Sequence, residues 1–343
     1  MRHLLNTLYI LSEDRYLSLD GENVVIQQDG TETARFPLHG LEGIVCFSYS
    51  GASPALMGAC AERGISLNFF TPHGRFLAGI YGEERGNVLL RRTQYRVADL
   101  PGASLQIARN FITGKLFNSR WVLERATRDH AMRVDVPAIK LASAKLAHSI
   151  RQVQQVQNSD SLRGLEGEAA TAYFGVWDEM ILQNKGDFFF HERSRRPPLD
   201  RVNALLSLFY AMLAGDCAAA LTAAGLDPYV GFLHTDRPGR RSLALDLQEE
   251  LRAPLVDRFV LSVINQRIIL PEHFNVTESG AVFLTDVGRK VVFVAWQNRK
   301  REELRHPFLQ ERIPWGLVPY VQALLLARFL RGDLDEYPPF LWK

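Results

Sequence analysis

Four side chains of the kinds that bind metal ions stand in two segments of this 343-residue chain. Glu166 lies in LRGLEGEAATAYF, and His234, Asp246 and Glu249 follow in GFLHTDRPGRRSLALDLQEELR. A catalytic divalent cation needs carboxylates, sometimes an imidazole, and open positions for water and a substrate phosphate. These residues therefore predict one metal site, assembled across helices, that does phosphodiester chemistry on nucleic acid.

Spacing leaves the last ligand open. Asp246 lies three residues before Glu249 and four before Glu250, so all three share one helix face. Spacing therefore does not decide which of the two glutamates is the ligand. Glu166 is expected near the start of a helix, beside two glycines that would let a phosphate backbone approach. Each residue also has a purely structural explanation. Glu166, as a glutamate near a helix start, would interact with the helix dipole. His234 after an apolar run is compatible with simple packing, and DLQEELR with a solvated helix face.

Arginines cluster near the predicted ligands, although the formal net charge of the chain is only +2. Segregated arginines on an almost neutral protein suit local contacts with phosphates, which position nucleic acid without reading its sequence. Solvated surface is the alternative interpretation of any one cluster. The candidate phosphate contacts are Arg193, Arg195, Arg196, Arg237, Arg240 and Arg241.

The elements that must position these residues change in character along the chain. Short alternating stretches broken by DG and GT turns predict β-hairpins, and LEGIVCFS predicts a buried strand. Ser53 and Pro54 open one helix that Gly64 ends. Later, apolar residues recur at three- and four-residue spacing, which is typical of amphipathic helices. We therefore predict an α+β protein with a small N-terminal β-rich domain, residues 1–97, and a larger all-α domain, residues 98–343, that binds metal and DNA.

Composition is that of an ordinary globular protein, with a hydrophobic fraction of 47%. No apolar run approaches the roughly 20 residues of a membrane span. The N-terminus turns acidic early and lacks a small-residue cleavage site, which argues against a signal peptide. Cys46, Cys60 and Cys217 form no CxxC pair and indicate buried, reduced thiols. We expect a cytoplasmic protein without a membrane partner.

Seven long segments match, in order, the motifs of a known family. They are LYILSEDRYLSLDGENVVI, PLHGLEGIVCFSYSGASPALMGACAERGISLNF, GRFLAGIYGEERGNVLLRRTQYR, LRGLEGEAATAYF, RSRRPPLDRVNALLSLFYAML, GLDPYVGFLHTDRPGRRSLALDLQEELRAPLVDR and YPPFLWK. Over nearly its full length the chain resembles the CRISPR-associated adaptation integrase, the first-numbered Cas protein, and is most similar to subtype I-C. The resemblance implies that Glu166, His234 and Glu249 are the catalytic metal ligands, with Asp246 as an acidic helper. It selects Glu249 over Glu250.

The resemblance also implies an activity and an assembly. The implied activity is that of a metal-dependent DNA endonuclease and integrase, which inserts short foreign DNA fragments as spacers into a CRISPR array in antiviral defence. The 3′-hydroxyl of the fragment attacks a phosphodiester at the repeat, and Mg²⁺ or Mn²⁺ neutralises the developing charge. The implied partners are double-stranded and branched DNA, a second copy of the chain, and the second-numbered Cas protein. Two homodimers would flank a central partner dimer, and the N-terminal domain would mediate dimerisation and partner contact.

Two other classes of protein stay open. A DNA-binding scaffold without catalysis would bind DNA whether or not divalent metal is present, and Glu166→Ala would not change that binding. A phosphohydrolase that acts on small phosphate esters would not be inhibited by duplex DNA. The arginine clusters favour a polymeric substrate over the second class. Tyr173 and Tyr210 sit at core spacing and are expected to pack rather than to act in the site.

Overall fold

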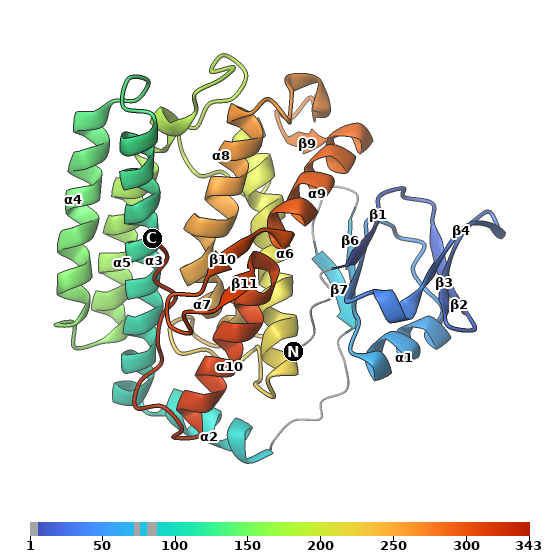
Figure 1. The fold of residues 1–343 in the computed structure, drawn as a ribbon, viewed down its shortest axis with the longest axis horizontal. Coiled ribbons are helices and arrows are strands. Elements are labelled where there is room, and N and C mark those ends of the chain that lie inside the picture. The colour runs from blue at the N-terminus through green and yellow to red at the C-terminus, as the bar shows by residue number, and fades with distance from the viewer. Residues whose placement is uncertain (1–5, 72–75, 81–87) are drawn as a thin grey trace.

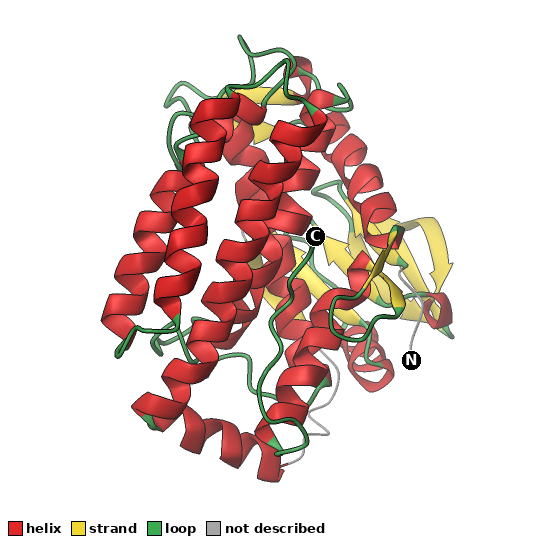
Figure 2. Ribbon diagram, turned by 60° about the vertical axis from the view of Figure 1, so that its left-hand side comes forward, coloured by secondary structure: helices red, strands yellow, loops and turns green. Residues whose placement is uncertain are grey.

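A strand-rich N-terminal part lies beside a larger helical part (Figure 1). The structure is a computed structural model, and it describes residues 6–71, 76–80 and 88–343. Figure 2 shows the strands of the N-terminal part beside the helical bundle, and a short pair of strands at the top of the bundle. The predicted mixture of strands and helices is confirmed.

The N-terminal part contains two sheets. In the first, of order β1-β5-β6-β7, the first three strands are parallel and β7 is antiparallel to β6. The second, β2-β3-β4, is an antiparallel meander whose turns use residues with positive φ, Gly21 at 57° and Gly30 at 77°. This meander is the predicted pair of hairpins. The strands are β1 (Thr7–Ile10), β2 (Tyr16–Asp20), β3 (Asn23–Gln28), β4 (Thr31–Pro37), β5 (Gly43–Cys46), β6 (Ser66–Phe70) and β7 (Phe76–Ile80).

Helix α1 (Pro54–Arg63) connects β5 to β6. The Ser53 hydroxyl accepts a hydrogen bond from the Leu56 N–H at 3.2 Å, and Gly64 ends the helix with a left-handed φ of 66°. Both predicted ends of this helix are confirmed. The predicted strand RFLAGIYG is present as β7 (Phe76–Ile80), and its remaining residues lie outside the described part of the chain.

The helical part contains the predicted long helices. It is not all-α, which corrects the prediction: β8 (Phe274–Val276) pairs with β9 (Val282–Leu284), and β10 (Glu303–Arg305) with β11 (Arg312–Pro314). Pairs of three-residue strands are too short to produce a recognisable period. The helices are α2 (Val88–Asp99), α3 (Pro101–Asp129), α4 (Val136–Val153), α5 (Ser159–Phe174), α6 (Arg201–Ala223), α7 (Ser242–Leu251), α8 (Arg258–Asn265), α9 (Asp286–Arg301) and α10 (Val318–Leu330).

Helix α2 crosses the predicted domain boundary between residues 97 and 98. Its buried Gln94 donates hydrogen bonds from Nε2 to the carbonyl oxygens of Asp227 and Val230, at 2.8 and 2.9 Å. The Asp227 N–H donates to Gln94 Oε1 at 2.9 Å. This helix therefore belongs to the framework that holds the segment leading to His234.

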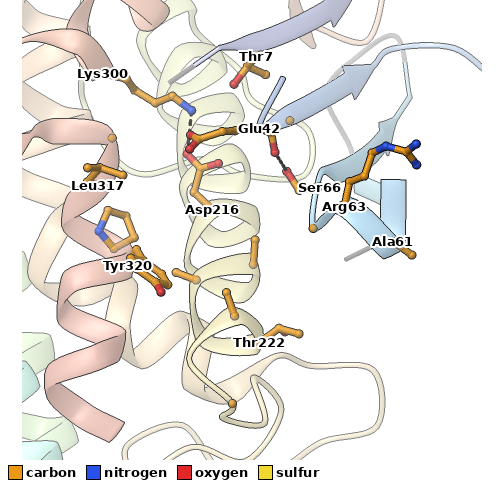
Figure 3. Close-up of a pocket in the computed structure, with 18 of the residues that line it drawn as sticks. Thr7, Glu42, Ala61, Arg63, Ser66, Asp216, Thr222, Lys300, Leu317 and Tyr320 are labelled. Atoms are coloured by element: carbon orange, nitrogen blue, oxygen red, sulfur yellow. Dashed lines mark hydrogen bonds and ion pairs between the residues drawn. The ribbon is translucent and has the colours of Figure 1, made fainter. Parts of the chain in front are cut away.

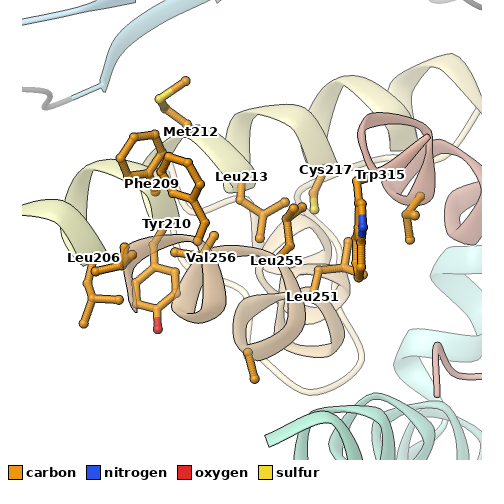
Figure 4. Packing of buried hydrophobic residues seen from close by; sticks show 14 of the residues in the cluster. Leu206, Phe209, Tyr210, Met212, Leu213, Cys217, Leu251, Leu255, Val256 and Trp315 are labelled. Atoms are coloured by element: carbon orange, nitrogen blue, oxygen red, sulfur yellow. The ribbon is translucent and has the colours of Figure 1, made fainter. Parts of the chain in front are cut away.

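Helix α6 is the core helix of the molecule. Its face with Leu206, Phe209 and Leu213 packs toward Leu251 and Val256 (Figure 4). By length and hydropathy it passes as a membrane span, although polar residues interrupt its apolar sequence, and 72% of its most apolar window is buried in the structure. Burial accounts for its composition. All three cysteines are free and buried, as predicted.

The C-terminal segment after α10 runs across the helices as an extended strap, residues 337–343. Asn118 of α3 fixes it: Nδ2 donates to the Phe340 carbonyl at 2.7 Å, and the Trp342 N–H donates to Oδ1 at 2.8 Å. Arg125 and Arg258 lie 4.2 and 4.5 Å from the centre of the Trp342 ring. The strap is therefore part of the packed structure, although it has no regular secondary structure.

Beneath the strap, His306 is buried and neutral. Its Nδ1 accepts from the Leu309 N–H at 3.2 Å, and its Nε2 lies 3.1 Å from Gln322 Oε1, so Nε2 carries the proton. Burial lowers the pKa of His306 to about 4 from 6.5. Stability that depends on neutral His306 is thus fully present above pH 6.5 and is lost as the pH falls toward 4.

We therefore expect the free energy of unfolding to fall more steeply between pH 6.5 and 4 in the wild type than in His306→Gln. Glutamine keeps a donor and an acceptor but does not titrate. Chemical denaturation at several pH values measures this difference. Parallel curves for the two proteins would contradict the assignment.

Candidate metal centre and nucleic-acid cleft

Glu166 lies in the middle of α5, not near a helix start as predicted. The helix begins at Ser159, because the Asn158 side chain accepts a hydrogen bond from the Ser161 N–H at 2.8 Å and caps it. The Glu166 side chain is 28% exposed, and its Oε1 contacts Lys115 Nζ. A capping or helix-dipole role, the alternative explanation, therefore does not apply to Glu166.

Helix α7 turns its two adjacent glutamates to different surroundings. Glu249 Oε2 lies 2.6 Å from Lys115 Nζ, and its Oε1 accepts a hydrogen bond from Arg252 at 3.0 Å. Glu250 is fully buried and accepts from the Tyr337 hydroxyl at 2.6 Å. Successive residues of a helix point about 100° apart, which spacing at i+3 and i+4 did not distinguish. Glu166 and Glu249 therefore meet at one ammonium group, and Glu250 serves the core.

Asp246 holds the loop that carries His234. Its Oδ2 accepts from the N–H groups of Phe232 and Leu233 at 2.6 and 3.0 Å, and its Oδ1 accepts from the His234 N–H at 3.0 Å. Oδ1 also lies 2.6 Å from His234 Nδ1. A Cβ on Gly231 would lie 2.8 Å from Oδ2, so only glycine permits this approach.

These four contacts occupy both oxygens of Asp246, which is completely buried. The sequence predicted a metal ligand at this position, and a ligand is expected to keep an oxygen free for the metal ion. Because the carboxylate accepts, the neutral form of His234 carries its proton on Nδ1 and keeps the lone pair on Nε2. The His234 side chain is 29% exposed. Asp246 thus fixes the tautomer and the ring orientation of His234.

The charges favour an ionised Glu249. Burial by itself would raise its pKa, but Arg252 and Lys115 together hold the pKa well below its usual range. Oε2 is buried and accepts no hydrogen bond of ordinary geometry, although Lys115 Nζ is close. An ionised carboxylate oxygen without a hydrogen bond is a suitable cation ligand.

The donor set of two carboxylates and one imidazole fits Mg²⁺ or Mn²⁺. Among the residues that the structure describes, no three His, Cys, Asp or Glu side chains stand close enough together to hold a metal ion as placed. Lys115 lies between the two glutamates instead.

A cavity of about 840 Å³ opens beside His234 and Glu249. Its lining includes His234 and Glu249, together with Phe47, Tyr49 and Thr71, which follow the carboxyl ends of β5 and β6. We call it the cleft. Tyr49 is 67% exposed. The Glu249 carboxylate, several arginines and an exposed aromatic ring in one cleft suit a nucleic-acid strand, since the ring can stack on a base while arginines contact phosphates.

The first predicted arginine cluster reaches the cleft. Arg195 and Arg196 are exposed and line it. Arg193 also lines it, but donates to Ser207 Oγ at 3.2 Å and to Asn203, and burial lowers its pKa to about 10. Arg193 therefore supports the wall of the cleft more than it offers a free charge.

The second predicted cluster lies in the loop after His234, outside the residues that line the cleft. Arg240 donates to Thr235 Oγ1 at 3.1 Å, and the Arg241 guanidinium lies 4.5 Å from the centre of the Phe76 ring. Arg237 is exposed in the same loop. The structure thus separates two groups that the sequence treated alike.

Three cationic residues of the site were missed from sequence. Arg252 and Arg289 line the cleft, and Lys115 joins the two glutamates. The spacing of Arg252, three residues after Glu249, was a usable signal. No local pattern marks Lys115.

After α7 the helix widens into a π-helical segment, Arg252–Asp257, which contains Pro254. Proline has no N–H to donate, and such segments are frequent at functional sites. Tyr173 and Tyr210 are buried, and both hydroxyls donate to Asp257, the first at 2.9 Å. Both are buried as predicted, although Tyr210 also lines the cleft. The network anchors the segment that carries Arg252.

A second cavity, of about 510 Å³, lies between the N-terminal sheet and helices α6, α9 and α10. Figure 3 shows Lys300 and Asp216 pointing toward one another there, with Nζ and Oδ2 3.5 Å apart. None of the predicted site residues lines it. The candidate chemistry therefore belongs to the cleft.

Known proteins match this chain over nearly its whole length. The family described as CRISPR associated protein Cas1 matches residues 8–298. CRISPR-associated endonuclease Cas1 2 of Rhodospirillum rubrum is 52% identical, with all of both chains covered. A casposase bound to an integration product has a TM-score of 0.84 at 21% identity, covering 98% of this chain and 94% of that one. A Cas6-RT-Cas1–Cas2 complex has a TM-score of 0.80 at 22% identity, covering 98% and 36%. This chain therefore belongs to the Cas1 family of CRISPR-associated proteins.

Proposed function

We propose that this protein is a metal-dependent DNA endonuclease and integrase that inserts short foreign DNA fragments into a CRISPR array. Its relatives are CRISPR-associated endonucleases, and its fold is shared with a casposase bound to an integration product. The observation that carries the proposal is the meeting of Glu166 and Glu249, from two helices, beside a cleft that His234 and arginines line.

We assign Glu166, Glu249 and Nε2 of His234 as the metal ligands, with Mg²⁺ or Mn²⁺ as the metal. The bound cation would neutralise charge that develops on the phosphate oxygens during displacement. Arg252 holds Glu249 ionised, and Asp246 keeps the His234 lone pair on Nε2. A histidine ligand makes Mn²⁺ competitive with Mg²⁺, which prefers oxygen.

The remaining groups of the cleft position DNA. Arg195 and Arg196 would contact phosphates on either side of the scissile bond, and Tyr49 would stack on a base. The 3′-hydroxyl of the incoming fragment would lose its proton as its oxygen attacks the phosphorus. A new P–O bond would form while the bond to the 3′-oxygen of the repeat strand breaks, and that oxygen would take up a proton. With water as nucleophile, the same site would nick DNA.

Asp246→Asn is expected to weaken Mn²⁺ binding and to slow joining by about 10- to 100-fold, the usual range for a group that orients a metal-binding histidine. Asparagine keeps one oxygen acceptor but no longer holds His234 in one tautomer. Calorimetric titration of Mn²⁺ and a joining assay measure the two effects. Unchanged Mn²⁺ affinity would contradict the positioning role.

The proposed partners are double-stranded and branched DNA, a second copy of the chain, and Cas2, which the Cas6-RT-Cas1–Cas2 neighbour contains. We propose two homodimers bridged by a partner dimer, a cytoplasmic location, and membership of subtype I-C, which the wording of the sequence motifs supports. The N-terminal part, residues 1–97, would mediate dimerisation and partner contact, and residues 98–343 would bind metal and DNA.

The decisive experiment is a strand-transfer assay. Wild-type protein, with and without its Cas2 partner, is mixed with a short duplex and a supercoiled plasmid that carries a repeat, in Mg²⁺, Mn²⁺ or EDTA. We expect joining in either metal, none in EDTA, and none for Glu166→Gln, although that variant still binds DNA. Glu168→Gln is the matched control, because Glu168 lies exposed on the same helix.

Two results would contradict the proposal. DNA binding without joining or nicking in any metal, with the partner present, would favour a scaffold. Turnover of small phosphate esters that duplex DNA does not inhibit would favour a phosphohydrolase.

A further inference from the structure

Lys115 occupies the point at which three helices of the candidate site converge. It lies on α3, and its Nζ contacts Glu166 Oε1 of α5 and Glu249 Oε2 of α7, the latter at 2.6 Å. Helices α3 and α7 approach closely here, since a Cβ on Gly114 would lie 2.9 Å from Glu250 Cγ. This close packing brings Lys115 within reach of both carboxylates.

We propose that Lys115 is a built-in, exchangeable cation: its ammonium group holds Glu166 and Glu249 together in the metal-free protein and leaves them when a divalent cation binds. The inference rests on the proposed function, because it takes these glutamates as metal ligands. In this inference, Lys115 competes with the metal ion for the carboxylate oxygen atoms of Glu166 and Glu249.

Burial and charge support a holding role. The side chains of Lys115, Glu166 and Glu249 are 13%, 28% and 7% exposed. Two carboxylates brought together away from water repel one another unless a cation lies between them. Without metal, the ammonium group of Lys115 supplies that charge, so the ligands stay assembled before any ion arrives.

Of the two cations at Glu249, Lys115 is the one that can leave. Arg252 donates to Glu249 Oε1 at 3.0 Å, its guanidinium lies 4.2 Å from the centre of the Tyr210 ring, and it is held by the charge of nearby Asp257. Lys115 has a flexible four-carbon stem and a compact ammonium group, and its ion pairs in the described part of the chain are those with the two glutamates. Metal binding would therefore displace Lys115 and leave Arg252 in place.

The competition has two measurable consequences. Removing the ammonium group takes away an occupant of the ligand oxygens, so metal should bind more tightly. It also leaves the two carboxylates facing one another, so the metal-free protein should be less stable. A ligand that binds only the folded state raises the melting temperature, and the rise is larger when the ligand binds more tightly.

The test uses the full chain without DNA. Mn²⁺ is titrated into wild type, Lys115→Met and Lys115→Gln by calorimetry, and melting temperatures are measured in EDTA and in Mn²⁺. Glutamine is included because its amide still donates a hydrogen bond to one carboxylate and keeps the protein folded if methionine does not. Lys140→Met is the matched control, since Lys140 pairs with Glu124 between α3 and α4 at a partly exposed position.

We expect Mn²⁺ to bind the Lys115 variants about tenfold more tightly than wild type or more, because a unit charge beside the ligands is removed. Their melting temperature should be lower in EDTA and rise more on addition of Mn²⁺. Lys140→Met should bind Mn²⁺ as wild type does. Equal or weaker Mn²⁺ binding by both Lys115 variants would overturn the inference.

Glu166→Gln separates this inference from the proposed function. If Glu166→Gln abolishes Mn²⁺ binding while the Lys115 variants bind as wild type, only the exchange role is wrong. If Mn²⁺ binding is insensitive to Glu166→Gln as well, the metal site itself is wrong, and the exchange role with it.

Discussion

His234→Ala is expected to slow metal-dependent DNA joining by about 10³-fold or more, because a ligand that supports several kcal/mol of transition-state stabilisation is lost. The fold should survive. The His234 side chain is 29% exposed, and Asp246 keeps the three backbone N–H groups that pin the loop. Strand-transfer rates in Mg²⁺ and Mn²⁺, with melting curves of both proteins, measure the effect.

His148→Ala is the control for this experiment, since His148 is exposed on α4, away from the cleft residues. It should join DNA at the wild-type rate. A His234→Ala protein that binds DNA and still joins it within about tenfold of wild type would show that the imidazole is no metal ligand.

Glu250→Ala is expected to lower the free energy of unfolding by about 3 kcal/mol or more, because three buried donors lose their acceptor at about 1–3 kcal/mol each. The donors are the Tyr337 hydroxyl at 2.6 Å, the Phe340 N–H at 2.5 Å and Gln322 Nε2 at 3.0 Å. Burial raises the pKa of Glu250 to about 8. Two donors belong to the C-terminal strap, so the strap should detach first.

Denaturant titration measures the loss, and proteolysis of residues 337–343 reports detachment of the strap. Tyr337→Phe is the graded control. It removes one donor and should lower the free energy of unfolding by only about 1 kcal/mol. A Glu250→Ala protein as stable as wild type would mean that the strap is held by Asn118 and Trp342 alone.

The adjacent glutamates show the limit of reading a site from spacing. Both stand within one turn of Asp246, and the family resemblance, not the spacing, selected Glu249. Packing of α7 supplies the physical reason: one glutamate meets Lys115 and Arg252, and the other meets Tyr337 and Gln322. Except for Arg252, three residues after Glu249, these partners lie far away in the sequence.

The sequence by itself determined the local elements and the chemical types of the site. Helical periodicity, the cap at Ser53 and the turn at Gly64 depend on neighbouring residues, so they can be read from the chain. The order of the ligand motifs identified Glu166, His234 and Glu249 as candidates. The sequence did not predict the short strand pairs or the start of α5 at Ser159, because a brief pattern carries little periodicity.

Only the tertiary structure decided how these residues combine. It placed Asp246 behind His234 and Lys115 between two glutamates. It also brought Arg195 and Arg196 to the cleft and left the arginine cluster 237–241 outside its lining. Each of these facts depends on how α3, α5 and α7 pack and where the sheet ends meet them. Such contacts join residues far apart in the chain, whose spacing follows from packing rather than from any local period.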